Sequence, residues 1–142
     1  MQSSPFIKLC WLKTACGGWC TSVRLSTFED RPCIFGCGET RDELCHYLQC
    51  PLLWQFALDS VGGVENNCNF LHRIGIYEPS VEKLNRLAFC HALYHTCVND
   101  TCCVGDNGMP YEKEVVLARA AQSSIFLSAS NWWQLDLLSV QS

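Results

Sequence analysis

The chain has no long hydrophobic run and no leader-like N-terminus. None of its apolar stretches approaches the roughly 20 residues that a membrane-spanning helix needs. The segment from Met1 to Pro5 lacks the basic residues and the following apolar stretch of a signal peptide. We therefore expect no membrane contact and a cytoplasmic or nuclear location, where thiols stay reduced and bind metal more readily than they form disulfides. The competing interpretation of 12 cysteines in 142 residues is a secreted disulfide scaffold.

The sequence also lacks a basic excess and a catalytic motif. Lys and Arg total 10 against 14 acidic residues, so the net charge is −4, whereas a duplex-binding domain usually carries a basic face. We find no glycine-rich phosphate loop, no nucleophile elbow and no acidic cluster for polymerase or nuclease chemistry. We therefore predict that the chain is not an enzyme. Its 49% hydrophobic content is enough for one core, so we expect a single domain over residues 1–142.

The most informative segment is a Cys-x3-Cys-x8-His-x3-Cys pattern. Its members are Cys33, Cys37, His46 and Cys50. Three thiolates and one imidazole suit a tetrahedral Zn²⁺, and four protein ligands leave no open position, so the predicted site is structural. Gly36 and Gly38 flank the second cysteine and allow the tight turn that such a site needs. The alternative is that these spacings arise by chance in a cysteine-rich chain.

The residues around this pattern resemble a known family. The matching segments are Trp19-Cys20-Thr21-Ser22, Arg24, Arg31-Pro32-Cys33, Phe35-Gly36-Cys37, Arg41-Asp42-Glu43-Leu44, His46-Tyr47-Leu48, Cys50-Pro51 and Trp54. They are similar to the zinc-binding domain that follows the reverse transcriptase in non-LTR (LINE-like) retrotransposon polyproteins, in the form common in dinoflagellate genomes. The resemblance is strong over about residues 8–60 and weaker to about residue 104. It implies the metal-ligand role for the four residues above and a reverse transcriptase domain as a partner, for a stand-alone remnant or derivative of such a polyprotein. No polymerase sequence precedes the segment, so reverse transcription is not carried over.

Cationic and aromatic residues are concentrated in the first 41 positions. The candidates for nucleic-acid contact are Lys8, Lys13, Trp19, Arg24, Arg31 and Arg41. Cations that neutralise phosphates, with aromatic rings that stack on unpaired bases, are typical of single-strand binding. We therefore predict weak, salt-sensitive binding of single-stranded or structured RNA or DNA. The alternatives are that these residues are solvated charges and core aromatics, and that the chain is a structural or protein-interaction module whose partners dock on helices 80–104 or 111–128, or on the Trp132-Trp133 pair.

The hydrophobic periodicity predicts a mainly α fold with a zinc-binding loop or short hairpin. We expect helices over 5–24, weakened at Gly17-Gly18, and over 42–60, bent at Pro51, with His46 and Cys50 on one face. We expect a long helix capped by Ser80 and a last helix from Pro110, whose apolar side would include Val115, Val116 and Ala121. The zinc-binding module would then be residues 26–60, the helical region 61–130 and the tail 131–142.

Two further groups of cysteine and histidine invite a metal assignment. Cys90, His91, His95 and Cys97 share the long predicted helix, and Cys16 and Cys20 share the first one. Because free cysteine behaves as a small buried hydrophobe, we expect these residues to pack in the core. A second metal ion on the long helix is the alternative.

Overall fold

The computed structural model describes residues 4–25, 31–38, 41–65, 67–101 and 113–130. These residues form a mainly helical domain without strands, which confirms the predicted fold class. The described part of the metal loop is irregular, as the loop alternative predicted. The helices are α1 (Pro5–Ala15), α2 (Ser22–Leu25), α3 (Leu44–Tyr47), α4 (Pro51–Val61), α5 (Phe70–Arg73), α6 (Val81–Thr101) and α7 (Lys113–Ser130). No helix in these ranges is long and apolar enough to cross a bilayer.

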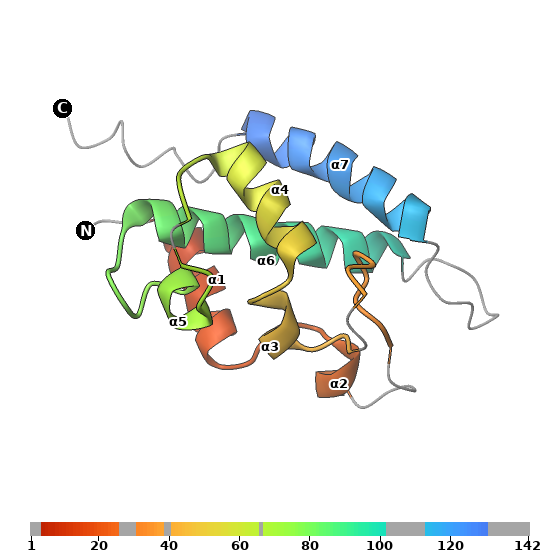
Figure 1. Cartoon of the computed structure of the whole chain (residues 1–142), viewed down its shortest axis with the longest axis horizontal. Helices are drawn as coiled ribbons and strands as arrows, with labels where there is room; N and C mark the ends of the chain where they lie inside the picture. Colours follow the sequence, from red (N-terminus) through yellow and green to blue (C-terminus); the bar gives the residue numbers. More distant parts are fainter. Residues whose placement is uncertain (1–3, 26–30, 39–40, 66, 102–112, 131–142) are drawn as a thin grey trace.

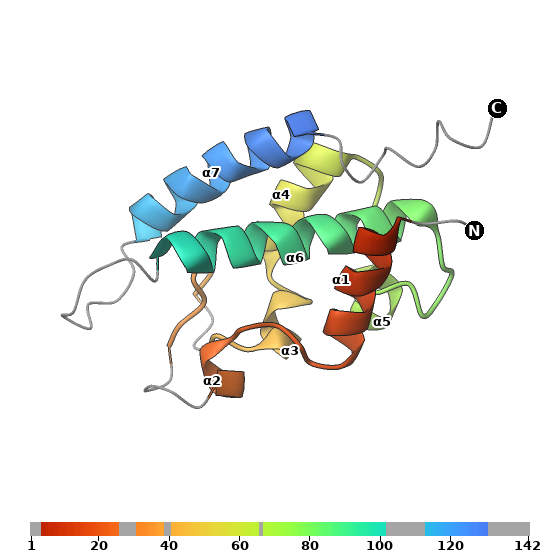
Figure 2. The same ribbon diagram turned by 180° about the vertical axis from the view of Figure 1, so that it is seen from behind.

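Helix α6 is the central element of the fold. It packs against α1, α4, α5 and α7. Figure 1 shows α4 in front of α6 with α7 along its upper side, and Figure 2 shows α1 crossing the opposite side. One core joins residues from α1 through α7 and includes the metal loop; its largest fully buried side chains are Trp19, Trp54, Tyr47, Tyr94, Phe35 and Phe89. The metal loop and the helical region therefore share a single hydrophobic core.

The first predicted helix is too long. Helix α1 begins as expected, with Pro5 in its first turn and the Ser4 hydroxyl accepting a hydrogen bond from the Ile7 amide at 3.2 Å. It ends at Ala15 because Gly17 adopts φ +65° and the Gly18 amide donates back to the Lys13 carbonyl at 2.5 Å. The glycines thus terminate the helix rather than weaken it, and α2 is a separate single turn.

The predicted helix over 42–60 is likewise two helices. Pro51 disfavours helical backbone at the residue before it, and Cys50 has ψ 117°. Helix α3 therefore ends at Tyr47, and α4 begins with Pro51 in its first turn. The prediction that His46 and Cys50 lie on one helical face is wrong, because the two residues belong to different elements.

The structure confirms the predicted start of α6 and only part of the predicted apolar side of α7. The Ser80 hydroxyl accepts from the Lys83 amide at 3.2 Å, which confirms the predicted cap of α6. Pro110, the predicted start of the last helix, and the Trp132-Trp133 pair lie outside the described residues. The predicted apolar side of α7 is right only in part, because Val116 is buried but Val115 and Ala121 are exposed. The buried residues of α7 are Val116, Ala120, Ser124 and Leu127.

Candidate metal centre

The four predicted ligands converge. One ligand atom from each of Cys33, Cys37, His46 and Cys50 lies within 4.8 Å of all the others, and no second group of three or more such atoms occurs in the described ranges. The sulfurs of Cys33 and Cys50 are 3.8 Å apart, and the Cys37 sulfur is 3.3 Å from Nε2 of His46. Zinc bonds of about 2.3 Å to sulfur and 2.0 Å to nitrogen give tetrahedral edges of about 3.8 Å between two sulfurs and about 3.5 Å between sulfur and nitrogen. The four ligand atoms are therefore close enough together to hold one metal ion.

Two turns and one helix position these ligands. The Gly36 amide donates to the Cys33 carbonyl at 3.0 Å, and Gly36 and Gly38 both have positive φ, so the chain reverses between the first two cysteines. Helix α3 carries His46, and Cys50 caps the start of α4. Cys33 and Cys50 are buried, and four protein ligands leave no open position. This arrangement suits a structural ion and offers no place for a substrate.

The electrostatics of the site favour cation binding. A hydrogen bond from Cys50 lowers the pKa of Cys33 from 9.0 to about 4, against an opposing effect of burial, and His46 adds a second hydrogen bond. The same shared proton, together with burial, raises the pKa of Cys50. Two neighbouring buried sulfurs can therefore hold one proton between them, but not two negative charges. A divalent cation bound here would replace that proton and neutralise both thiolates.

Asp42 organises the surroundings of the centre, and sequence reasoning missed it. Its buried carboxylate accepts hydrogen bonds from the hydroxyl of Tyr47 at 2.7 Å, the hydroxyl of Tyr94 at 3.0 Å and the amide of Ser22 at 2.7 Å. The Tyr47 hydroxyl in turn accepts from the Ile34 amide in the metal loop at 3.1 Å. Burial and the Asp42 charge raise the pKa of Tyr47, so its hydroxyl remains a donor. One carboxylate thus connects α2, the metal loop, α3 and α6.

Trp19 does not belong to a nucleic-acid surface, which corrects the sequence prediction. Its side chain is fully buried. The ring stacks on Tyr47 at 6.2 Å between centroids and packs on Tyr94 at 5.1 Å, and its Nε1 donates to the Thr14 hydroxyl at 2.9 Å. No face of the indole is available to a base. Trp19 is a core residue that joins the first loop to α3 and α6.

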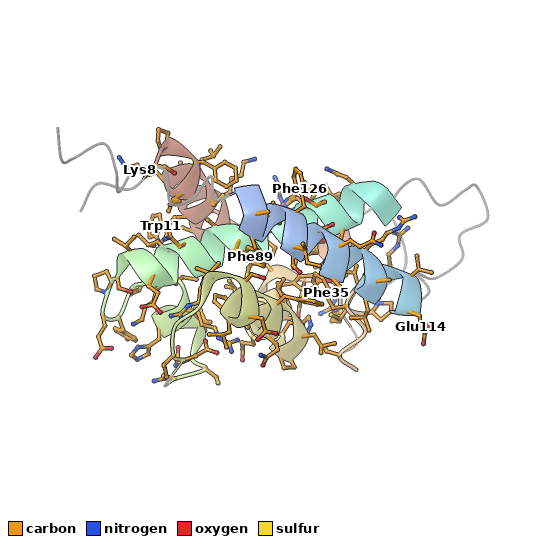
Figure 3. The ribbon with its side chains drawn as sticks, turned by 90° about the horizontal axis from the view of Figure 1, so that it is seen from above. Lys8, Trp11, Phe35, Phe89, Glu114 and Phe126 are labelled. Carbon is orange, nitrogen blue, oxygen red and sulfur yellow. The ribbon has the colours of Figure 1, made fainter. Side chains whose placement is uncertain are left out.

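Hydrogen bonds bring together the chain segments that carry four of the five predicted cations. The Arg24 guanidinium donates to the Gly18 carbonyl at 3.3 Å, and the Gly18 amide donates to the Lys13 carbonyl. Backbone bonds from Val23 to Asp42 and from Asp42 to Arg31 bring α2, Arg31 and Arg41 together. We call Lys13, Arg24, Arg31 and Arg41 the basic edge. Lys8, labelled in Figure 3, lies nearer the N-terminal end of α1 and is not part of the basic edge.

The histidines of α6 pack in the core, as predicted, but in contact with a different cysteine. His91 is buried, its Nδ1 is 3.6 Å from the Cys10 sulfur, and its ring stacks on His95 at 4.2 Å between centroids. Cys90 and Cys97 are also fully buried. The prediction that Cys16 and Cys20 pack in the core is wrong, because both are exposed. They lie on the glycine-broken segment after α1, not on one helix.

Acid is expected to destabilise the fold through His91. Burial, reinforced by His95 and Lys13, lowers the pKa of His91 from 6.5 to about 3. Between these values the unfolded chain takes up a proton that the folded chain does not, so stability is full above pH 6.5 and is lost as the pH falls towards 3. The slope of unfolding free energy against pH should be lower in His91→Gln by up to about 1.4 kcal/mol per pH unit. Urea unfolding from pH 7 to 5.5, with zinc content monitored, measures both slopes. Equal slopes would contradict this assignment.

Comparisons of the chain with protein-family models, with curated proteins and with solved structures find no match. The resemblance to the zinc-binding domain of retrotransposon polyproteins therefore stays a prediction.

Proposed function

We propose that the chain is a zinc-stabilised domain that binds single-stranded nucleic acid weakly along its basic edge, and that it derives from the zinc-binding region of a retrotransposon polyprotein. The observation that carries the proposal is the pair of backbone hydrogen bonds from Val23 to Asp42 and from Asp42 to Arg31, which bring the chain segments of Arg24, Arg31 and Arg41 together near the Cys3His group. In this proposal the zinc ion is structural and has no catalytic role. It holds the metal loop against α3 so that cations distant in sequence face one ligand.

The charge distribution limits how strong this binding can be. Lys13, Arg24 and Arg41 are exposed, and the Arg41 guanidinium is 3.9 Å from the Glu43 carboxylate, a loose pair that a phosphate can displace. The net charge of −4 opposes approach of a polyanion to the rest of the surface. Trp11 is 37% exposed on α1 and is fixed by a hydrogen bond from its Nε1 to the Ile74 carbonyl, so it can take the stacking role predicted for Trp19.

The salt dependence of RNA binding tests the proposal. Lys13→Ala/Arg24→Ala should weaken binding of a single-stranded RNA and lower the slope of log affinity against log salt by about 1.4, or 0.7 for each lost phosphate contact. The control, Arg119→Ala on α7, removes a charge outside the basic edge and should leave the slope unchanged. Fluorescence anisotropy at several salt concentrations measures all three proteins, and circular dichroism checks that each is folded.

Two results would refute this function. One is absence of binding by the wild-type protein at low salt; the other is an equal loss of slope in the edge variant and the α7 control. The interaction-module alternative would then be favoured, because α7 exposes two adjacent large apolar residues, Ile125 at 70% and Phe126 at 71%. Figure 3 shows Phe126 on the outer side of α7.

A further inference from the structure

A pocket of about 370 Å³ lies between α4, α5 and the first turns of α6. Val64, Glu65 and Asn67 from the connection between α4 and α5 also line it; Figure 1 shows α5 and the start of α6 at the left. The residues that matter for its chemistry are Trp54, Glu65, His72, Arg73, Lys83 and Arg86. Its volume falls in the range of roughly 300–1,000 Å³ that is typical of small-molecule sites. None of these residues belongs to the metal centre or to the basic edge.

One of the two buried arginines is fully engaged. Arg73 donates to both carboxylate oxygens of Glu65, at 2.5 and 2.9 Å, and to the Leu48 carbonyl at 3.0 Å. Its guanidinium also lies 4.6 Å from the centre of the Trp54 ring. The Arg73 and Glu65 side chains are only 5% and 13% exposed, and their charges cancel. The Arg73–Glu65 pair therefore lines the pocket but does not bind the ligand.

Arg86 is buried to the same degree but has poor partners. Its side chain is 6% exposed. Among the described residues, its hydrogen bonds run only from Nη1, to the Gly62 carbonyl and to Glu82, each at 3.4 Å. A guanidinium has five donors in a rigid fork that matches an oxyanion. Its ion-pair partner Glu82 is half exposed to water, so an oxyanion in the pocket can compete with this 3.4 Å contact for the guanidinium.

The rim adds a second cation, Lys83, which is 19% exposed and lies 3.7 Å from the Glu78 carboxylate. Its ammonium also donates to the carbonyls of Tyr77 and Glu78 at 3.2 and 2.9 Å. The nearby carboxylates of Glu78 and Glu82 are 82% and 51% exposed, so water screens them strongly. Buried Glu65 balances Arg73, whereas Arg86 and Lys83 are paired with Glu82 and Glu78, whose side chains are exposed. A phosphate in the pocket would therefore replace two exposed carboxylates, which can turn out into water.

We propose that this pocket binds a small phosphate monoester, with its phosphate oxygens on the Arg86 fork and the Lys83 ammonium. A phosphate group accepts hydrogen bonds from both cations at once, and His72 lines the same pocket as a further donor. The volume left beyond the phosphate accommodates a small organic group against Val64 and the edge of Trp54. This site is independent of the proposed nucleic-acid function, because the two use different residues.

Titration of the zinc-loaded full chain tests the proposal. Inorganic phosphate and adenosine monophosphate are added separately, and binding is followed by NMR shifts of the arginine side-chain Nε–H groups and by calorimetry. Wild type should bind each saturably, whereas Arg86→Lys, which keeps the charge but loses the fork, and Lys83→Ala should each bind about tenfold more weakly. Arg119→Ala is the matched control on α7 and should bind as wild type does. If Arg86→Lys does not fold, Lys83→Ala decides the outcome.

Several outcomes would overturn this assignment. Absence of saturable binding to folded wild type excludes the site, and unchanged affinity in both Lys83→Ala and Arg86→Lys places the ligand elsewhere. Competition by a single-stranded RNA without terminal phosphates would identify the backbone phosphodiester as the ligand and exclude the monoester. Lys13→Ala/Arg24→Ala should keep wild-type affinity for phosphate, so failure of the nucleic-acid proposal and failure of this one are distinguishable.

Discussion

Cys33→Ser and His46→Ala are expected to unfold the domain, because each removes one of four zinc ligands. Structural zinc contributes apparent binding free energies on the order of 10 kcal/mol, which is comparable to the whole stability of a domain of this size. The wild-type protein, purified under reducing conditions without chelator, should hold one zinc per chain. Elemental analysis measures this stoichiometry, and circular dichroism measures the helicity lost in each variant or after chelation.

The chain offers close controls for the ligand variants. Cys45 directly precedes His46 but is exposed and stands outside the ligand group, and Cys68 is exposed in the segment before α5. Cys45→Ser and Cys68→Ser should retain zinc and the wild-type unfolding midpoint. A wild-type protein without zinc, or a Cys45→Ser variant as unstable as Cys33→Ser, would contradict the Cys3His assignment.

Asp42→Ala is expected to cost about 3–5 kcal/mol of unfolding free energy, because it leaves the buried donors of Tyr47, Tyr94 and Ser22 without their acceptor. Asp42→Asn keeps the shape but offers one acceptor oxygen instead of two, so its cost should be smaller. Urea unfolding in the presence of zinc measures both. The matched control is Glu43→Ala, which removes only the loose pair with Arg41 and should cost less than about 1 kcal/mol.

The Asp42 variants also test whether the domain unfolds as one unit. Asp42 connects the metal loop to α6 through Tyr94, so a weakened network should lower zinc affinity as well as helix stability. If Asp42→Ala unfolded with the same midpoint as Glu43→Ala, the network would not be a major source of stability. If helicity were lost while zinc stayed bound, the metal loop would be a separate unit, contrary to the single core of the structure.

The sequence alone predicted two local features of the domain, the metal-ligand group and the cap of α6. The spacing of Cys33, Cys37, His46 and Cys50 predicted the one ligand cluster in the described ranges, because ligand type and loop length are local properties. The Ser80 cap was also predicted, since a hydroxyl that precedes an apolar-periodic run needs only its own first turn as a partner. Gly17 and Pro51 were visible in the sequence, but we expected a weakened and a bent helix, whereas the backbone leaves the helical conformation at Gly17 and at Cys50.

The features that depend on distant partners were decided by packing alone. Trp19 is an aromatic residue of the type that stacks on bases, but in the structure it packs against Tyr47 and Tyr94 in the core. Asp42 reads as a surface acid, and only the folded chain brings two tyrosine hydroxyls and an amide to its carboxylate. The buried face of α7 is chosen by its contacts with α4 and α6, because its sequence has apolar residues on several sides. The sequence alone determines features whose partners lie within a few residues, such as helix caps and ligand spacing. Burial and charge pairing depend on residues that are distant in sequence, so only the tertiary structure decides them.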